Sequence, residues 1–217
     1  MKLYGYYRSS ASYRVRIALN LKNLQYENEF IDLYRSGGEQ FSPQYRMLNP
    51  QCLVPMMEDG GHLMTQSLAI LEYLEETYPE PPLLPEQPVA RARVRALAEQ
   101  VACDIQPLAN IRVLRRLGEL DQDEEARLAW SRYWIAQGFA ALEAGLAGAR
   151  ETGAYAYGET PTLADVCLVP QVYNAERVGL DMSAYPTLQA VADHCRAQPA
   201  FVAAAPENQP DAPAEEA

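Results

Sequence analysis

Three serines within four positions near the start of the chain are the residues whose types and spacing best suit chemistry: Ser9, Ser10 and Ser12. They stand just before an apolar periodicity of helical type that begins at Tyr13. The first backbone N–H groups of a helix have no intrahelical partner, so this position favours an anion such as a thiolate or a carboxylate. The plainer alternative is that Ser9 or Ser10 is only the N-cap of the helix.

A short strand and a helix must position these serines. Residues 2–7 alternate weakly and are rich in tyrosine, which predicts a strand, and residues 13–22 repeat apolar side chains at helical spacing. A second strand is expected over residues 26–33. The serines therefore lie in a loop between a strand and a helix.

A second group of candidate residues surrounds a predicted β-hairpin. Two short apolar runs are separated by Asp59-Gly60-Gly61, which is a hairpin signal. Pro55 cannot donate to a strand ladder, so it belongs at the start of its strand, where a cis peptide bond is compatible and the backbone of Val54 stays available. Gln66 and Ser67 precede an amphipathic helix over residues 68–74, which gives a second helix N-terminus for an anion.

A proline-rich stretch divides the chain. Residues 77–88 hold five of the sixteen prolines, a density that no helix or central strand tolerates. We expect an α/β domain over residues 1–82, a linker over 83–88 and an all-helical domain over 89–217, with a coil tail from about residue 206. Thr162 and Asp165 have the spacing of a capping box in the helical part, which we interpret as structural.

The composition excludes several classes of function. The sequence has 29 acidic and 18 basic side chains, a net charge of −11 that argues against nucleic acid or an anionic membrane as partner. Its four cysteines have no CxxC spacing, so we expect reduced, mostly buried thiols and no metal. Without a signal-peptide pattern or a long apolar run, we expect a cytoplasmic protein. His62 and His194 stand in no catalytic constellation.

Motifs from both parts of the chain resemble the zeta class of the glutathione transferase superfamily, the group of the maleylacetoacetate isomerases and their maleylpyruvate isomerase relatives. The resemblance covers nearly the whole chain. It implies a thioredoxin-like first domain, an all-α second domain, glutathione as cofactor and a homodimer. The motifs are Arg8-Ser9-Ser10 with residues 14–19, Val54-Pro55, Gln66-Ser67 with residues 72–76, Gln106-Pro107-Leu108 with Asn110, and residues 168–172 with 174–177.

The resemblance also implies roles for individual residues. Ser9 would donate a hydrogen bond to the glutathione sulfur, with Ser10 beside it. Val54 would pair its backbone with the cysteinyl part, in front of a cis Pro55. The γ-glutamyl end would be held by Gln66 and Ser67, and further cofactor contacts would come from Gln40, Gln106 and Asn110. The plainer alternatives are ordinary strand geometry at 54–55, an ordinary cap at Ser67 and solvated amides at Gln40 and Gln106.

One departure from the family pattern constrains the chemistry. Zeta members often carry Ser-Ser-Cys, whereas this chain has Ala11 at the third position, so the thiol must come from the cofactor. Lowering a thiol pKa from ~8.5 by roughly two units corresponds to about 2.7 kcal/mol. A hydrogen bond to a charged group supplies roughly 1.5–3 kcal/mol, and a helix N-terminus adds about 0.3–1 kcal/mol. Ser9 and the helix end are therefore sufficient.

The expected substrate is an anionic keto acid, which local arginines must attract against the negative net charge. Arg8, next to Ser9, and Arg177, in the family's substrate-side motif, are the main candidates, and Arg112 is a third. Arg14 and Arg16 are expected in surface or interdomain ion pairs.

The expected reaction is the glutathione-dependent cis–trans isomerisation of 4-maleylacetoacetate to 4-fumarylacetoacetate, a step of aromatic amino-acid catabolism. Three alternatives stay open at this point. They are a maleylpyruvate isomerase, a broad glutathione transferase or haloacid-converting enzyme that consumes glutathione, and a binding module without catalysis on the same fold.

Overall fold

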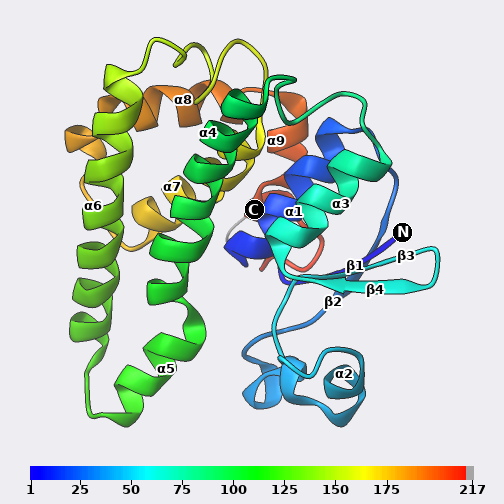
Figure 1. Ribbon diagram of the computed structural model, residues 1–217. Helices are drawn as coiled ribbons and strands as arrows, with labels where there is room; N and C mark the ends of the chain where they lie inside the picture. The colour runs from blue at the N-terminus through cyan, green and yellow to red at the C-terminus, as the bar shows by residue number, and fades with distance from the viewer. Residues whose placement is uncertain (214–217) are drawn as a thin grey trace. The chain divides into compact units, whose positions relative to one another are not determined.

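A computed structural model describes residues 1–213 and divides into two compact units (Figure 1). The first unit combines residues 1–83 with residues 198–213, and the second unit spans residues 84–197. The division between Leu83 and Leu84 lies in the proline-rich stretch. The C-terminal segment, expected in the helical domain, instead groups with the first unit.

The first unit is built on a four-stranded mixed sheet in the order β2-β1-β3-β4. β1 (Lys2–Gly5) pairs in parallel with β2 (Glu27–Phe30) and antiparallel with β3 (Met56–Asp59), which forms the predicted hairpin with β4 (His62–Thr65). The chain crosses from β1 to β2 through α1 (Ser10–Leu21), and α3 (Ser67–Thr77) follows the hairpin. This βαβ then ββα order is the expected thioredoxin-like arrangement, and α1 and α3 lie side by side (Figure 1).

Two elements of this unit differ in length from the prediction. The strand expected over residues 26–33 is ordered as β2 only over Glu27–Phe30, at the exposed edge of the sheet. It ends because the Asp32 carboxylate accepts hydrogen bonds from the backbone N–H groups of Tyr34 and Arg35, which forms a turn. α1 begins at Ser10 rather than Tyr13, because Ser9 caps it.

The short segment between β2 and β3 carries 3-10 turns η1 (Arg35–Gly37) and η2 (Glu39–Phe41) and the helix α2 (Pro43–Leu48). Ser42 caps α2 by accepting a hydrogen bond from the N–H of Tyr45 at 3.2 Å. The cap at Ser9 has the same hydrogen-bond pattern, in which Oγ accepts from the backbone N–H three residues later.

The C-terminal segment completes the first unit. α9 (Pro199–Ala204) packs on α1, and the 3-10 turn η6 (Pro206–Asn208) follows it. Asn20 of α1 donates a hydrogen bond to the carbonyl of Ala200 at 3.0 Å. The tail expected as coil from about residue 206 is thus structured at η6 and remains hydrogen-bonded at Asp211, whereas residues 214–217 lie outside the described part.

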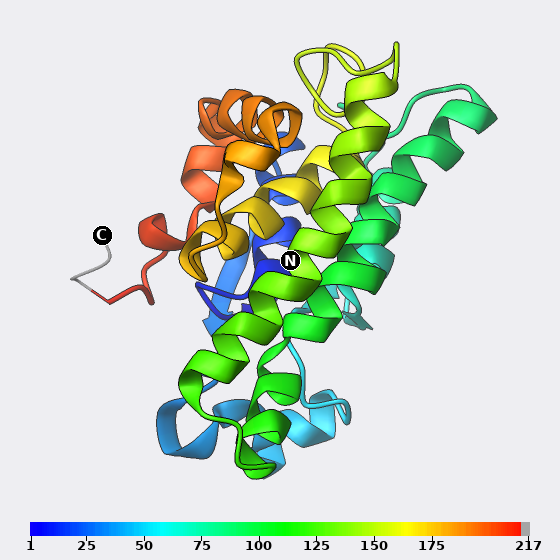
Figure 2. The same cartoon turned by 90° about the vertical axis from the view of Figure 1, so that its left-hand side faces the viewer.

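The second unit is helical, as predicted (Figure 2). The pattern expected over residues 89–117 is interrupted, since a π-helical stretch and a 3-10 turn with Pro107 near its start separate α4 from α5. No helix among residues 1–213 is both long and apolar enough to cross a membrane. The elements of the second unit are α4 (Pro88–Glu99), η3 (Gln100–Ile105), η4 (Gln106–Ala109), α5 (Ile111–Glu119), α6 (Glu124–Gly148), α7 (Leu163–Arg177), η5 (Met182–Ala184) and α8 (Pro186–Arg196).

The predicted capping box is confirmed at the start of α7. The Asp165 carboxylate accepts hydrogen bonds from both the N–H and the hydroxyl of Thr162, at 2.8 and 2.9 Å, and one from the N–H of Ala156. Its role is structural, because the carboxylate is fully buried in these bonds. The cysteines are four free thiols, of which Cys103 is exposed and the other three are buried.

Candidate active site

Ser9 lies at the N-cap of α1, half-buried, with its Oγ accepting a hydrogen bond from the backbone N–H of Ser12 at 3.2 Å. Because the oxygen accepts this bond, the hydroxyl hydrogen can point to a group beyond the helix. Ser10 is the first helical residue, so its N–H is one of those without an intrahelical acceptor. Ser9 can therefore cap α1 through its oxygen and donate a hydrogen bond through its hydroxyl hydrogen at the same time.

A buried arginine holds the backbone before Ser9 through hydrogen bonds. Arg16, 3% exposed, donates from Nη2 to the Tyr7 carbonyl at 2.8 Å and from Nη1 to the Tyr6 carbonyl at 3.4 Å. The Tyr6 carbonyl also accepts from the N–H of Ser9 at 3.0 Å. The expectation of a surface or interdomain position is wrong for Arg16, because these carbonyls and the Ala204 carbonyl belong to the first unit, face inward and need a buried donor.

Arg8 is half-buried and lies near two tyrosine rings. Its guanidinium carbon is 5.6 Å from the centroid of the Tyr7 ring and 5.8 Å from that of Tyr34, which are cation–π distances. Burial lowers the pKa of Arg8, but Tyr7, Tyr34 and Tyr6 outweigh it and raise the pKa above its ordinary value. A permanent positive charge thus stands next to Ser9.

The Val54–Pro55 peptide bond is cis, as the resemblance implied, and it immediately precedes β3. The Val54 side chain packs against the buried cluster of Ile31, Tyr45 and Met56. The loop before it is fastened at the Leu53 carbonyl, which accepts from the Tyr45 hydroxyl at 2.7 Å and from the Asn49 amide at 2.8 Å.

Ser67 is the first residue of α3 and only 6% exposed. Its Oγ accepts a hydrogen bond from Nε of Arg14 at 3.0 Å, and Arg14 is 2% exposed. Arg14, also expected in a surface or interdomain ion pair, is buried within the first unit and connects α1 to the start of α3. Gln66, exposed and at φ 70, has its amide hydrogen-bonded to Gln51 at 2.9 Å.

Gln40 lies in η2 and is 3% exposed, so the alternative of a solvated amide is wrong for this residue. Its amide sits over Gly38, where a Cβ atom would come within 2.6 Å of Oε1. The Gln40 Oε1 atom is buried and has no hydrogen-bond partner among the described residues. A buried acceptor of this kind favours an N–H donor from a bound molecule.

The second unit holds the other candidates. Gln106 is partly exposed in η4, and Asn110 caps α5 by accepting from the N–H of Arg112 at 3.1 Å. The Arg112 side chain is exposed. Arg177 is the exposed last residue of α7, and its guanidinium donates to the Asn174 amide oxygen at 2.9 Å. Their roles toward a ligand stay predictions.

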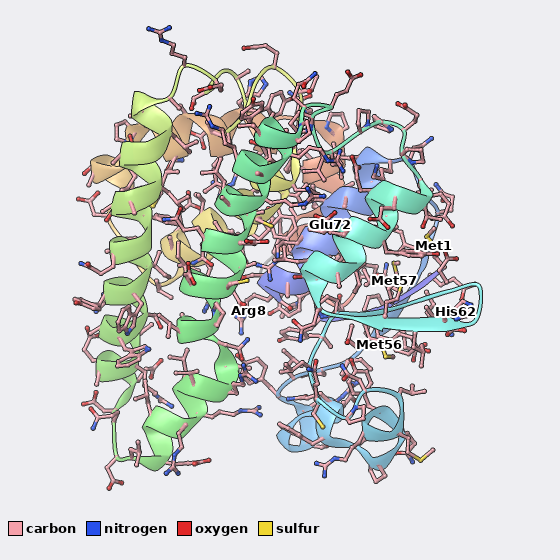
Figure 3. The ribbon with its side chains drawn as sticks, viewed as in Figure 1. Met1, Arg8, Met56, Met57, His62 and Glu72 are labelled. Carbon is pink, nitrogen blue, oxygen red and sulfur yellow. The ribbon has the colours of Figure 1, made fainter. Side chains whose placement is uncertain are left out.

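Within the first unit, Arg8, Ser9 and Ser10 lie at the start of α1, and the bond from Arg14 to Ser67 links α1 to the start of α3. Arg8 marks the start of α1 in Figure 3, whereas His62 lies at the tip of the β3–β4 hairpin, away from it. His62 is exposed and forms no cluster with the serines. The first unit thus has two helix N-termini with three serine hydroxyls, at Ser9, Ser10 and Ser67. Its histidine, His62, is not placed to act as a base for them.

Two family models match the chain. One is described as the N-terminal domain of glutathione S-transferase and covers residues 3–82, and the other is its C-terminal domain and covers residues 124–197. The chain belongs to the glutathione transferase family. The strand order and the helical second unit of this glutathione transferase agree with that membership.

Individual relatives refine the placement of this glutathione transferase. It is 51% identical over 215 residues to the maleylacetoacetate isomerase of Pseudomonas aeruginosa, with 99% of this chain and 100% of the relative covered. A holo structure of a bacterial zeta-class maleylpyruvate isomerase is 47% identical, with a TM-score of 0.95 and 98% and 100% coverage. A maleylacetoacetate isomerase from Methylobacterium extorquens with bound malonate and glutathione is 43% identical, with a TM-score of 0.95 and 99% and 100% coverage. The resemblance to the zeta class is confirmed.

The structure also adds residues that the sequence analysis of this glutathione transferase missed. Arg14 and Arg16 hold Ser67 and the serine loop, and both lie inside the apolar run of residues 13–19. That run was the available signal, because a helix whose remaining side chains are all buried must bury its arginines as well. Asp211, in the C-terminal segment, had no such local signal.

Proposed function

We propose that this glutathione transferase is a glutathione-dependent cis–trans isomerase of an anionic keto acid, with 4-maleylacetoacetate as the substrate. The observation that carries the proposal is the Ser9 hydroxyl at the N-terminus of α1, whose oxygen is occupied by the Ser12 N–H and whose hydrogen remains to donate. Relatives named maleylacetoacetate isomerase over the full chain length support the reaction class.

The residues of the first unit fit a tripeptide thiol. Ser9 offers a hydroxyl donor for a sulfur anion, and Ser67 offers a helix N-terminus for a carboxylate. Gln40 offers a buried acceptor that has no hydrogen-bond partner within residues 1–213. Val54, before the cis Pro55, would pair through its backbone, and Gln66 would contact the γ-glutamyl end. Gln106 and Asn110 would add contacts from the second unit. These residues would offer neutral donors and acceptors to the backbone of the tripeptide and a helix N-terminus to its charged carboxylate end.

In the proposed mechanism, the protein stabilises an anion and supplies no nucleophile of its own. When bound, glutathione supplies a thiolate that adds to the conjugated double bond of the substrate, permits rotation and leaves again, so that it is regenerated. Ser9 donates to the sulfur, and the N–H groups of Ser10 and the following residues add the positive end of α1. Ala11 offers no competing thiol.

Arginines would hold the substrate carboxylates and the developing negative charge. Arg8, next to Ser9 and fixed near the rings of Tyr7 and Tyr34, is the candidate in the first unit. Arg177 and Arg112 are the candidates in the second unit, where both side chains are exposed. The Methylobacterium relative with bound malonate supports an anionic ligand in a protein of this kind.

The test of the proposed function is whether glutathione is consumed. Maleylacetoacetate and maleylpyruvate are each supplied with a small amount of glutathione, and product and free thiol are measured together. We expect many turnovers per glutathione and faster conversion of maleylacetoacetate. Stoichiometric loss of thiol would instead indicate a transferase or haloacid-converting enzyme, and binding without turnover would indicate a binding module. Faster conversion of maleylpyruvate would reassign the substrate.

Arg177→Ala is expected to raise the KM for the keto acid by roughly tenfold and to change kcat little, because loss of a charged hydrogen bond used in binding costs about 1.5 kcal/mol. Steady-state kinetics at saturating glutathione measure this. Arg93→Ala is the control, since Arg93 is an exposed arginine of the same unit that pairs with Glu151. Equal KM values for both variants would remove Arg177 from the site.

The homodimer and the cytoplasmic location also stay part of the proposal. The resemblance to the zeta class supports the dimer. Exposed apolar side chains on η2 and α2, Phe41, Met47 and Leu48, are compatible with a surface covered by a second copy.

A further inference from the structure

The C-terminal segment reaches the serine loop at a single carboxylate. Asp211 Oδ2 accepts a hydrogen bond from the backbone N–H of Tyr7 at 2.9 Å, across 204 positions of sequence. Tyr7 is 4% exposed and is two residues before Ser9. The contact therefore joins the last described part of the chain to the backbone that sets the position of the candidate sulfur donor.

This contact completes a set of bonds around one short backbone stretch. Arg16 donates hydrogen bonds to the carbonyls of Tyr6 and Tyr7, and Asp211 accepts one from the N–H of Tyr7. The Tyr6 carbonyl also receives the N–H of Ser9 at 3.0 Å. Of these side chains, Arg16 belongs to α1 itself, so Asp211 is the one that fixes the stretch from another segment.

The other oxygen of the same carboxylate is in an unfavourable position. Asp211 Oδ1 is buried and has no hydrogen-bond partner among the described residues. Burial raises the pKa of Asp211, and the bond from the Tyr7 N–H and the charge of Arg16 oppose this rise. A carboxylate held here at the cost of part of its solvation indicates that the bond to the Tyr7 N–H has a specific use.

We propose that Asp211 is a positioning residue, which holds the Tyr6–Ser9 backbone so that the Ser9 hydroxyl meets the glutathione sulfur. The inference rests on the proposed function of Ser9. Asp211 touches no reacting atom and acts through Tyr7. A shift of about 1 Å in a positioned group can cost on the order of 100-fold in rate, so one bond two residues from Ser9 is enough to matter.

The path from the segment to the loop is anchored independently of Asp211. Arg16 Nε donates to the Ala204 carbonyl at 3.0 Å, and the Gln209 amide donates to the carbonyls of Ala203 and Ala205 at 2.9 Å. Asn208 donates to the Val202 carbonyl at 2.8 Å, a bond within the C-terminal segment itself. Removal of the Asp211 side chain should therefore leave α9 and η6 in place, and Asn208 provides a matched control.

The experiment compares Asp211→Ala, Asp211→Asn and Asn208→Ala in the full chain. The pKa of the glutathione thiol bound to each protein is measured from the ultraviolet absorbance of the thiolate, together with kcat and KM. We expect Asp211→Ala to raise this pKa and to lower kcat about fivefold to tenfold, with the KM for the keto acid unchanged. Asp211→Asn should retain most activity, because its amide oxygen can still accept from the Tyr7 N–H. Asn208→Ala should behave as the wild type.

A second measurement needs no glutathione. Amide hydrogen exchange of the segment that contains Tyr7 should be faster in Asp211→Ala than in the wild type and unchanged in Asn208→Ala. If Asp211→Ala does not fold, deletion of residues 211–217 is the substitute and should give the same changes. Unchanged exchange, or an unchanged thiol pKa in a folded variant, would overturn the role of Asp211. A wild-type protein that does not lower the thiol pKa would instead overturn the proposed role of Ser9.

Discussion

Ser9→Ala is expected to lower kcat by well over tenfold and to raise the pKa of the bound glutathione thiol. The hydroxyl is one donor to an anion, and such a bond is worth roughly 1.5–3 kcal/mol, which corresponds to about 10- to 150-fold. The fold should survive, because loss of the N-cap costs only about 1 kcal/mol. Kinetics with thiolate absorbance measure the first effect, and thermal unfolding measures the second.

The chain contains a matched control for this substitution. Ser42 caps α2 with the same bond, in which Oγ accepts from a backbone N–H three residues later, and the distance is 3.2 Å at both serines. Ser42→Ala should therefore cost the same stability and leave kcat unchanged. If both variants lose equal activity, the effect of Ser9 is that of a cap, and its assignment as the sulfur donor is wrong.

Lys22→Met is expected to lower the free energy of unfolding by about 3–5 kcal/mol, because it leaves a buried carboxylate without its cation. The Lys22 ammonium donates to Glu75 at 2.8 Å and to the carbonyls of Tyr78 and Pro81 at 2.8 and 2.9 Å. Neither side chain of the ion pair is more than 6% exposed. Denaturant unfolding followed by far-ultraviolet circular dichroism measures the loss.

Lys2→Met is the control for the buried pair. Lys2 lies 3.9 Å from Glu29, with side-chain exposures of 35% and 52%, so its removal should cost at most about 1 kcal/mol. The double variant Lys22→Met with Glu75→Leu should be less destabilised than the sum of its single variants, since no isolated charge remains buried. Additive losses, or equal losses for Lys2 and Lys22, would contradict the importance of the buried pair.

Local sequence patterns predicted the helix and the hairpin that position the candidate site of the first unit. The serines preceded an apolar run and became the cap and first turn of α1, and Asp59-Gly60-Gly61 became the turn of the β3–β4 hairpin. Both features depend on residues within a few positions of each other, so the local sequence alone is enough to predict them. The start of α1 was placed three residues late, because the serines were counted as loop.

Long-range packing could not be predicted in the same way. The apolar run of residues 13–19 could indicate that Arg14 and Arg16 are buried, but not that their acceptors are the distant Ser67 hydroxyl and Ala204 carbonyl. Gln40 is buried because the chain folds back over Gly38, which sequence spacing does not indicate. The tail from about residue 206 was expected as coil, because the partner of Asp211, the Tyr7 N–H, lies 204 positions earlier in the chain.

The discontinuous first unit has a consequence for how this enzyme is made. Ribosomes release a chain from its N-terminus, and domains generally fold as they emerge. Here residues 84–197 are synthesised before residues 198–213 can pack on α1. Until then the Ala204 carbonyl and the Asp211 carboxylate are missing from their places beside Arg16 and Tyr7. The unit that carries Ser9 is therefore completed only after the second unit has been synthesised, although most of its residues emerge from the ribosome before that unit.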